Sequence, residues 1–282
     1  MSHDTASAFR EVLVLHFRAR SATPAALLLA GLTVIAPPLQ AHPTAEPDPP
    51  SAPAPSLRVS AGQDFLFGAP RGSVSIRVGR LFARTEGGVF ERTFANLSAE
   101  PDDFDGIALG ADLALRMADR VDAVVGVGLA RSRVDSEFSG FTYEDGQPIR
   151  QTTRFRQIPL TLGARLYLTP RGREISRFAW IPARTALYVG GGAGLIHHAY
   201  EQEGEFVDEE SLDIFADELR SSGWTSVVYL GAGAELRVTT RAALLADVRY
   251  TRGSARAAGD FAEWEDIGLG GLAASVGVAL TF

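Results

Sequence analysis

Nine charged side chains stand inside alternating runs of small and apolar residues, where a charge is unusual. They are Arg77, Asp112, Arg116, Asp122, Arg165, Glu235, Arg237, Asp247 and Arg249. Five are basic and four are acidic, and they can pair with one another because an unpaired buried charge is costly. If they share one enclosed space, the sequence predicts either an ion-pair network that fills it or a narrow path for ions.

A second candidate for chemistry is the histidine pair His197–His198. A serine hydrolase needs a serine poised beside a histidine, and the neighbouring Tyr200 and Glu201 do not complete a triad. Adjacent residues of a strand face opposite sides, so these histidines do not easily share a metal ion. The chain also has no cysteine. We therefore expect no enzyme activity, no metal site and no cofactor.

The elements that must position the charged residues are eight runs in which large apolar residues alternate with small or polar ones. They are Val74–Arg84, Gly106–Met117, Val121–Arg133, Phe155–Thr169, Thr185–Tyr200, Gly223–Val238, Ala242–Arg252 and Leu269–Phe282. A period of two predicts β-strands. Strands of about ten residues are long enough to cross a hydrocarbon layer when they are tilted.

The run Phe155–Thr169 separates its two faces most clearly. Leu160 and Leu162 fall on one face, whereas Gly163 and Arg165 fall on the other. Glycine is a poor choice for a solvated strand face, but it suits the crowded interior of a small barrel. We therefore predict an all-β fold, an eight-stranded antiparallel up-and-down transmembrane β-barrel. Its apolar face would meet lipid, and its nine charges would lie in the lumen.

Short and long connections alternate along the chain, as in bacterial outer-membrane barrels with short periplasmic turns and long outer loops. Both termini would then be periplasmic. The tight turns are residues 118–120 and 239–241, and the long connections are residues 85–105, 134–154, 201–222 and 253–268. Pro170–Arg184 is an overlong turn. We expect its Phe178 and Trp180 to dip into the membrane interface and its arginines to lie near lipid phosphates.

The last residues of the chain alternate up to a terminal aromatic side chain. Ser275, Gly277, Leu280 and Phe282 resemble, at matching spacing, the assembly signal of outer-membrane barrels. That resemblance implies insertion by the bacterial barrel-assembly machinery. Phe282 would be the last lipid-facing residue of the closing strand.

Three segments, Ile158–Leu168, Tyr188–Leu195 and Ser275–Phe282, look like strands of one known superfamily. They resemble the small eight-stranded outer-membrane β-barrels, which include the transmembrane domain of outer membrane protein A and outer membrane protein X. The resemblance covers about residues 57–282 and implies the fold and a location in the bacterial outer membrane. It does not imply a particular activity, because one fold carries many functions. We also expect a monomer.

Four arginines stand at the facing ends of two consecutive runs, at Arg131, Arg133, Arg154 and Arg156. Parity points them toward lipid. Guanidinium suits bidentate contact with phosphate, so the four predict a lipopolysaccharide-phosphate patch. The alternative is ordinary anchoring at the interface without a specific lipid.

The third long connection, Glu201–Arg220, is strongly acidic. Within it, Leu212, Phe215 and Leu219 would share one side of a short amphipathic helix. The acidic residues do not follow the spacing of a 12-residue calcium loop, so we expect a solvated acidic surface.

One residue does not fit the alternation. Arg80 would face lipid in the middle of the first strand, and a bulge near Gly79 would switch the parity.

The first residues read as an export segment. Positive charge in Phe17–Arg20, an apolar run over Pro24–Pro37 and small residues ending at Ala41 predict a signal peptide over 1–41, or alternatively an uncleaved anchor. A Pro-rich periplasmic linker would follow at 42–56, and the barrel at 57–282.

The formal net charge of −7 argues against nucleic acid as a partner. The sequence favours a structural or surface-interaction role in the outer membrane, with a plugged lumen and acidic outer loops. Two alternatives stay open. One is a small-solute or ion channel, and the other is a soluble lipocalin-like lipid carrier whose apolar face lines a cavity.

Overall fold

The computed structural model describes residues 65–143, 145–176, 178–207 and 214–282. They belong to the second of two compact units, Leu57–Phe282. The predicted signal peptide and linker lie outside the described residues. Among the described residues, no helix has the length and apolar character needed to span a membrane.

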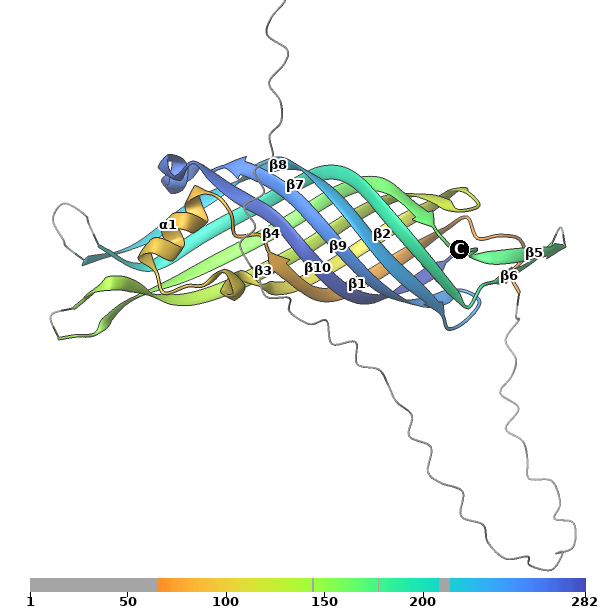
Figure 1. The fold of residues 1–282 in the computed structure, drawn as a ribbon, viewed down its shortest axis with the longest axis horizontal. Coiled ribbons are helices and arrows are strands. Elements are labelled where there is room, and N and C mark those ends of the chain that lie inside the picture. Colours follow the sequence, from red (N-terminus) through yellow and green to blue (C-terminus); the bar gives the residue numbers. More distant parts are fainter. Residues whose placement is uncertain (1–64, 144, 177, 208–213) are drawn as a thin grey trace, which may run out of the picture. The chain divides into compact units, whose positions relative to one another are not determined.

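Within those ranges, eight antiparallel strands close into one barrel (Figure 1). They are β1 (Gly72–Ala83), β2 (Gly106–Ala118), β3 (Val121–Thr142), β4 (Pro148–Tyr167), β7 (Thr185–Val207), β8 (Ile214–Arg237), β9 (Ala242–Arg256) and β10 (Asp266–Thr281). Each strand pairs with the next barrel strand in the chain, and β10 pairs with β1 from Ser73↔Thr281 to Ala83↔Gly271. The predicted eight-stranded up-and-down barrel is confirmed.

The two faces of the strands are as different as the alternation predicts. Leu162 on β4 is 64% exposed and Leu230 on β8 is 71% exposed, and both point away from the barrel. Asp112 and Arg165 are 3% and 4% exposed, and both point into the lumen. The wall therefore carries an apolar outer surface around a charged interior.

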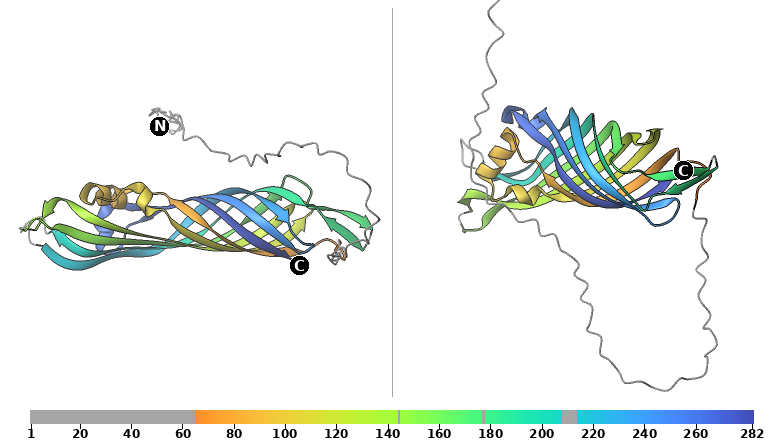
Figure 2. Two further views of the ribbon diagram at one scale, coloured as in Figure 1. Left: turned by 90° about the horizontal axis from the view of Figure 1, so that it is seen from below. Right: turned by 45° about the vertical axis from the view of Figure 1, so that its right-hand side comes forward.

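Two hairpins are longer than expected and project beyond the rest of the barrel at one end (Figures 1 and 2). β3 and β4 continue to Thr142 and from Pro148, so most of residues 134–154 is strand and not loop. β7 and β8 likewise continue through much of 201–222. Because β4 also pairs with β7 as far as Gln151↔Gly204, the projections form a four-stranded extension of the wall.

The predicted amphipathic helix around Phe215 and Leu219 is wrong for the described residues, which are strand from Ile214 onward. Phe215 pairs with Phe206 of β7, so the neighbouring strand satisfies the backbone polar groups. Leu219 packs against the buried core at this end of the barrel. Its spacing from Phe215 fits one face of a strand as well as one face of a helix.

The same end holds three short helices, α1 (Gly88–Asn96), η1 (Pro101–Phe104) and η2 (Gly259–Trp264), with α1 lying against the barrel end (Figure 1). Each helix buries at least one aromatic residue: Phe90, Phe104 and Phe261. The connection expected to be a loop at 85–105 is therefore a folded cap.

The opposite end carries the chain terminus and the hairpin β5 (Gly172–Ser176) and β6 (Ala179–Pro182) (Figure 1). Trp180 is buried there and its backbone pairs with Leu66. The expectation that Trp180 dips into the membrane interface is wrong, because its ring packs over Gly172 inside the hairpin. Phe178 is exposed.

The predicted bulge near Gly79 is also wrong. β1 keeps an unbroken register with β10 and with β2 through this point. Arg80 does face outward, and its guanidinium lies 3.4 Å from the Asp105 carboxylate beside η1. Asp105 compensates the charge of Arg80. The strand therefore keeps its alternation of inward and outward side chains without a bulge.

Candidate functional site

Asp112 is the centre of an ion-pair network in the lumen. Its Oδ1 accepts a hydrogen bond from Arg77 at 3.0 Å, and its Oδ2 accepts one from Arg249 at 3.2 Å. Arg165 reaches Oδ2 at 3.5 Å. These partners come from β1, β9 and β4, so one buried carboxylate on β2 links strands across the barrel interior.

Two further carboxylates extend the network along the lumen. Asp247 lies 3.1 Å from Arg77, and Glu235 lies 3.5 Å from Arg165 and 3.8 Å from Arg237. The structure thus places seven of the nine predicted residues in one connected set, Arg77, Asp112, Arg165, Glu235, Arg237, Asp247 and Arg249.

Three tyrosines complete the network, and the sequence analysis did not single them out. Tyr167 donates to Glu235 at 2.8 Å and Tyr188 donates to Asp247 at 2.9 Å. The guanidinium of Arg165 lies 4.3 Å from the Tyr188 ring centroid, and that of Arg249 lies 4.7 Å from Tyr229. The hydroxyl of a buried tyrosine usually needs a hydrogen-bond partner. Tyrosines on the small-residue face of the strands could therefore have predicted contacts with the lumen charges.

Glycines on the lumen face make room for these rings. A Cβ at Gly163 would overlap the Tyr229 hydroxyl, and a Cβ at Gly233 would overlap the Tyr188 hydroxyl. The glycine content that favoured a barrel interior therefore has a specific steric role at these two positions.

Arg116 and Asp122 do not join the central set. Arg116 pairs with the exposed Asp119 at 2.8 Å, and Asp122 pairs with Arg171 at 2.8 Å. Arg171 also lies 4.4 Å from the Tyr167 ring and donates to the backbone of Ala118. The β5–β6 hairpin therefore sends an arginine back into the barrel mouth, whereas we expected Arg171 near lipid phosphates.

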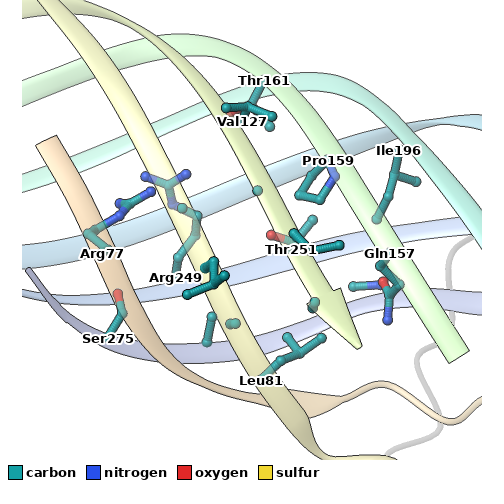
Figure 3. Close-up of a pocket in the computed structure, with 18 of the residues that line it drawn as sticks. Arg77, Leu81, Val127, Gln157, Pro159, Thr161, Ile196, Arg249, Thr251 and Ser275 are labelled. Carbon is teal, nitrogen blue, oxygen red and sulfur yellow. The ribbon is translucent and has the colours of Figure 1, made fainter. Parts of the chain in front are cut away.

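A cavity of about 90 Å³ lies beside the charged layer (Figure 3). The guanidinium groups of Arg77 and Arg249 line one side of it, and Gln157 and Ile196 line the other. The amide oxygen of Gln157 accepts a hydrogen bond from the backbone of Gly270 at 2.7 Å. The cavity therefore lies between the ion-pair network and the residues around Gln157.

The second layer is an aromatic plug at the end of the barrel that holds α1. Phe90 of α1 packs edge-to-face on Phe104 and Tyr200, with ring centroids 5.2 and 5.8 Å away. Phe261 of η2 lies 5.3 Å from Tyr200, whose hydroxyl is 2.8 Å from Thr93. These side chains are buried and belong to one apolar cluster at this end of the barrel.

The two histidines lie on opposite sides of the wall, as adjacent strand residues do. His197 packs against Trp224 on the outside, with ring centroids 5.1 Å apart. His198 is buried inside, and no described residue hydrogen-bonds to either of its ring nitrogens. Within the described ranges, the pair thus has no nucleophile hydrogen-bonded to it.

The four arginines of the predicted phosphate patch are brought together on the outer surface. In the register between the strands, Arg131 on β3 lies directly opposite Arg156 on β4, and Arg133 lies directly opposite Arg154. Arg133 also lies 3.4 Å from Asp135, and Arg154 lies 2.8 Å from Glu203.

The acidic segment forms the extended parts of β7 and β8. Glu201, Glu203 and Glu205 lie on β7, and Asp217 and Glu218 lie on β8. The acidic residues at 208–210 and 213 are outside the described residues. Among those that are described, no group of three or more acidic or histidine side chains could hold a metal ion.

The C-terminal residues take the two sides of β10. Leu280 and Phe282 are exposed on the outside, and Gly277 packs so closely on Ile76 and Arg77 of β1 that a Cβ would overlap them. Ser275 lines the cavity, and the carbonyl of Phe282 accepts a hydrogen bond from Arg71 at 2.7 Å. The last strand is paired to its end. Recognition by the barrel-assembly machinery stays a prediction.

The described barrel interior holds the Asp122–Arg171 pair, the ion-pair network and the aromatic plug. An eight-stranded barrel is just wide enough for its side chains to fill.

The fold defines an eight-stranded antiparallel barrel with an apolar exterior, of the kind found in small outer-membrane proteins. Comparisons with known protein families and with curated protein sequences find no match. Solved structures similar to the chain include a surface protein, an outer membrane protein and an attachment invasion locus protein. They are Neisserial surface protein A (12% identity, 75% of this chain and 96% of that one, TM-score 0.42), OprG from Pseudomonas aeruginosa (15%, 77% and 99%, 0.40) and Ail from Yersinia pestis (13%, 75% and 99%, 0.36). The fold class itself rests on the closed strand order of this chain.

Proposed function

We propose that this protein is an integral barrel of the bacterial outer membrane that acts through its outer surface and does not pass solutes. The apolar exterior supports a lipid environment. Side chains such as Ile76, Leu113, Leu162 and Val276 are exposed on the outside of the wall. A closed barrel also satisfies its backbone hydrogen bonds internally, which a hydrocarbon layer requires.

The lipid-carrier alternative needs the apolar face to line a cavity. Here that face points outward, and the interior carries buried charges such as Asp112 and Arg165. The described structure is therefore opposite to a carrier barrel, and we set that alternative aside.

Periplasmic termini are part of the proposal. The backbone of Phe282 bonds with Arg71 and Gly72, and Arg71 bonds with Arg116 close to the tight β2–β3 turn. Both ends of the barrel chain are therefore beside the short turns, which face the periplasm in bacterial barrels. The long β3–β4 and β7–β8 projections would then be extracellular.

The single observation that carries the closed-lumen proposal is the ion-pair network centred on Asp112. Four arginines and three carboxylates pair across the lumen, and moving them apart for a passing ion would expose unpaired buried charge. We propose no catalytic role for the buried His198, since its nearest described partners supply no nucleophile.

We expect the full-length protein to produce no current steps in planar bilayers, with an open porin as the positive control. This expectation is supported by the side chains packed in the lumen, which are the Asp122–Arg171 pair, the ion-pair network and the aromatic plug. Steady unitary conductance that disappears in Arg165→Leu would show instead that ions pass along the network, and the channel alternative would replace this proposal.

A further inference from the structure

The outer surface of β3 and β4 carries an unusual arrangement of like charges. Arg131 lies directly opposite Arg156, and two residues further along, Arg133 lies directly opposite Arg154. Side chains that face each other across antiparallel strands have Cβ atoms about 5 Å apart, and like charges there are destabilising. We call these four residues the four-arginine patch: Arg131, Arg133, Arg154 and Arg156. Repulsion between their like charges destabilises the strand pair unless negative charge lies nearby.

Acidic neighbours neutralise only the outer pair. Arg133 pairs with Asp135 and Arg154 pairs with Glu203, and these four side chains are 42–71% exposed, so each ion pair contributes little. A hydrogen bond from Thr152, with help from Arg133, lowers the pKa of Asp135, so this carboxylate stays ionised. Among the described residues, Arg131 and Arg156 have no acidic partner.

The unneutralised pair stands where the apolar surface ends. On β3 the outward residues change from the exposed Val125 and Val127 to Arg131, and on β4 they change from Leu160 to Arg156. Trp224 on β8 is exposed and packs edge-to-face against His197. Tryptophan is enriched at membrane–water interfaces, so this level of the wall corresponds to lipid headgroups.

We propose that the four-arginine patch binds the phosphate groups of a phosphorylated glycolipid of the outer leaflet. This inference rests on the proposed location in the outer membrane with the projecting hairpins outside. Phosphate supplies the negative charge that Arg131 and Arg156 lack, and each planar guanidinium can donate two parallel hydrogen bonds to it. The acyl chains of the same lipid would lie along the apolar side chains immediately below, at Val127 and Leu160.

The test titrates full-length protein in non-ionic detergent with bis-phosphorylated lipid A, with lipid A lacking both phosphates, and with inorganic phosphate. We expect the phosphorylated lipid to bind at least about tenfold more tightly than the dephosphorylated lipid. Replacing the four arginines by glutamine should remove that preference. Inorganic phosphate should compete only weakly, because it has no acyl chains.

A matched control keeps the total charge change but leaves the patch intact. The variant with Arg80, Arg150, Arg220 and Arg252 replaced by glutamine changes four other outward-facing arginines and should bind like the wild type. The Arg131→Gln/Arg156→Gln variant carries the test if the fourfold variant does not give the compact form on unboiled gels. An unchanged phosphate preference in either patch variant overturns the proposal, as does an equal loss in the control. Failure of the protein to fold in lipid would instead count against the proposed function.

Discussion

Asp112→Asn is expected to lower the free energy of unfolding by about 3–5 kcal/mol, which is the usual cost of leaving a buried charge without its partner. The substitution keeps the shape of the side chain but removes its charge. Arg77, Arg165 and Arg249 would then share only Asp247 and Glu235. Urea titration of the protein in lipid vesicles, followed by tryptophan fluorescence, measures the change.

Asp119→Asn is the matched control, since it removes the same charge from an ion pair. Its side chain is 96% exposed beside Arg116, and exposed pairs contribute little to stability. We expect almost no shift in its urea midpoint. If Asp112→Asn were as stable as the wild type, the lumen network would not hold the barrel together.

Phe90→Ala is expected to cost about 3–5 kcal/mol, the range for removing a fully buried aromatic side chain. Phe90 is completely buried and its ring contacts those of Phe94, Phe104, Phe155 and Tyr200. Because these contacts attach α1 to the barrel, the loss should fall mainly on the cap. We expect faster protease cleavage within residues 85–105 along with the lower stability.

Phe141→Ala serves as the control for that variant, because Phe141 is partly exposed at the tip of the β3–β4 hairpin. It should leave both cleavage and stability close to those of the wild type. Equal cleavage rates in Phe90→Ala and the wild type would mean that α1 stays attached without the aromatic plug.

The sequence predicted the barrel and the direction of its side chains because a strand has a period of two residues. Leu162 and Arg165 could only fall on opposite faces. The same alternation assigned all nine charges to the lumen, where the structure joins seven of them in one network. The alternation could not predict that Arg131 lies directly opposite Arg156. That position depends on the register between two strands, which the pattern of a single strand does not determine.

The parts that escaped prediction depend on contacts between distant residues. β3 and β7 continue past the apolar band because their neighbouring strands keep forming backbone hydrogen bonds with them. Outside the lipid both faces of a strand can be polar, so the sequence there shows no alternation that would predict a strand. Arg171 reaches Asp122 through the folding of the β5–β6 hairpin. The α1 helix is folded by packing of Phe90 on Tyr200, more than 100 residues away in the chain.

The most direct test of the account uses the unmodified protein in lipid nanodiscs, with its leucine methyl groups labelled for NMR. The central claim is that the apolar face touches lipid while the lumen is packed with protein. We predict strong nuclear Overhauser effects from acyl chains to Leu162 and Leu230, and none to the buried Leu245 and Leu269. Acyl-chain contacts at Leu245 together with none at Leu162 would show that the wall faces the other way.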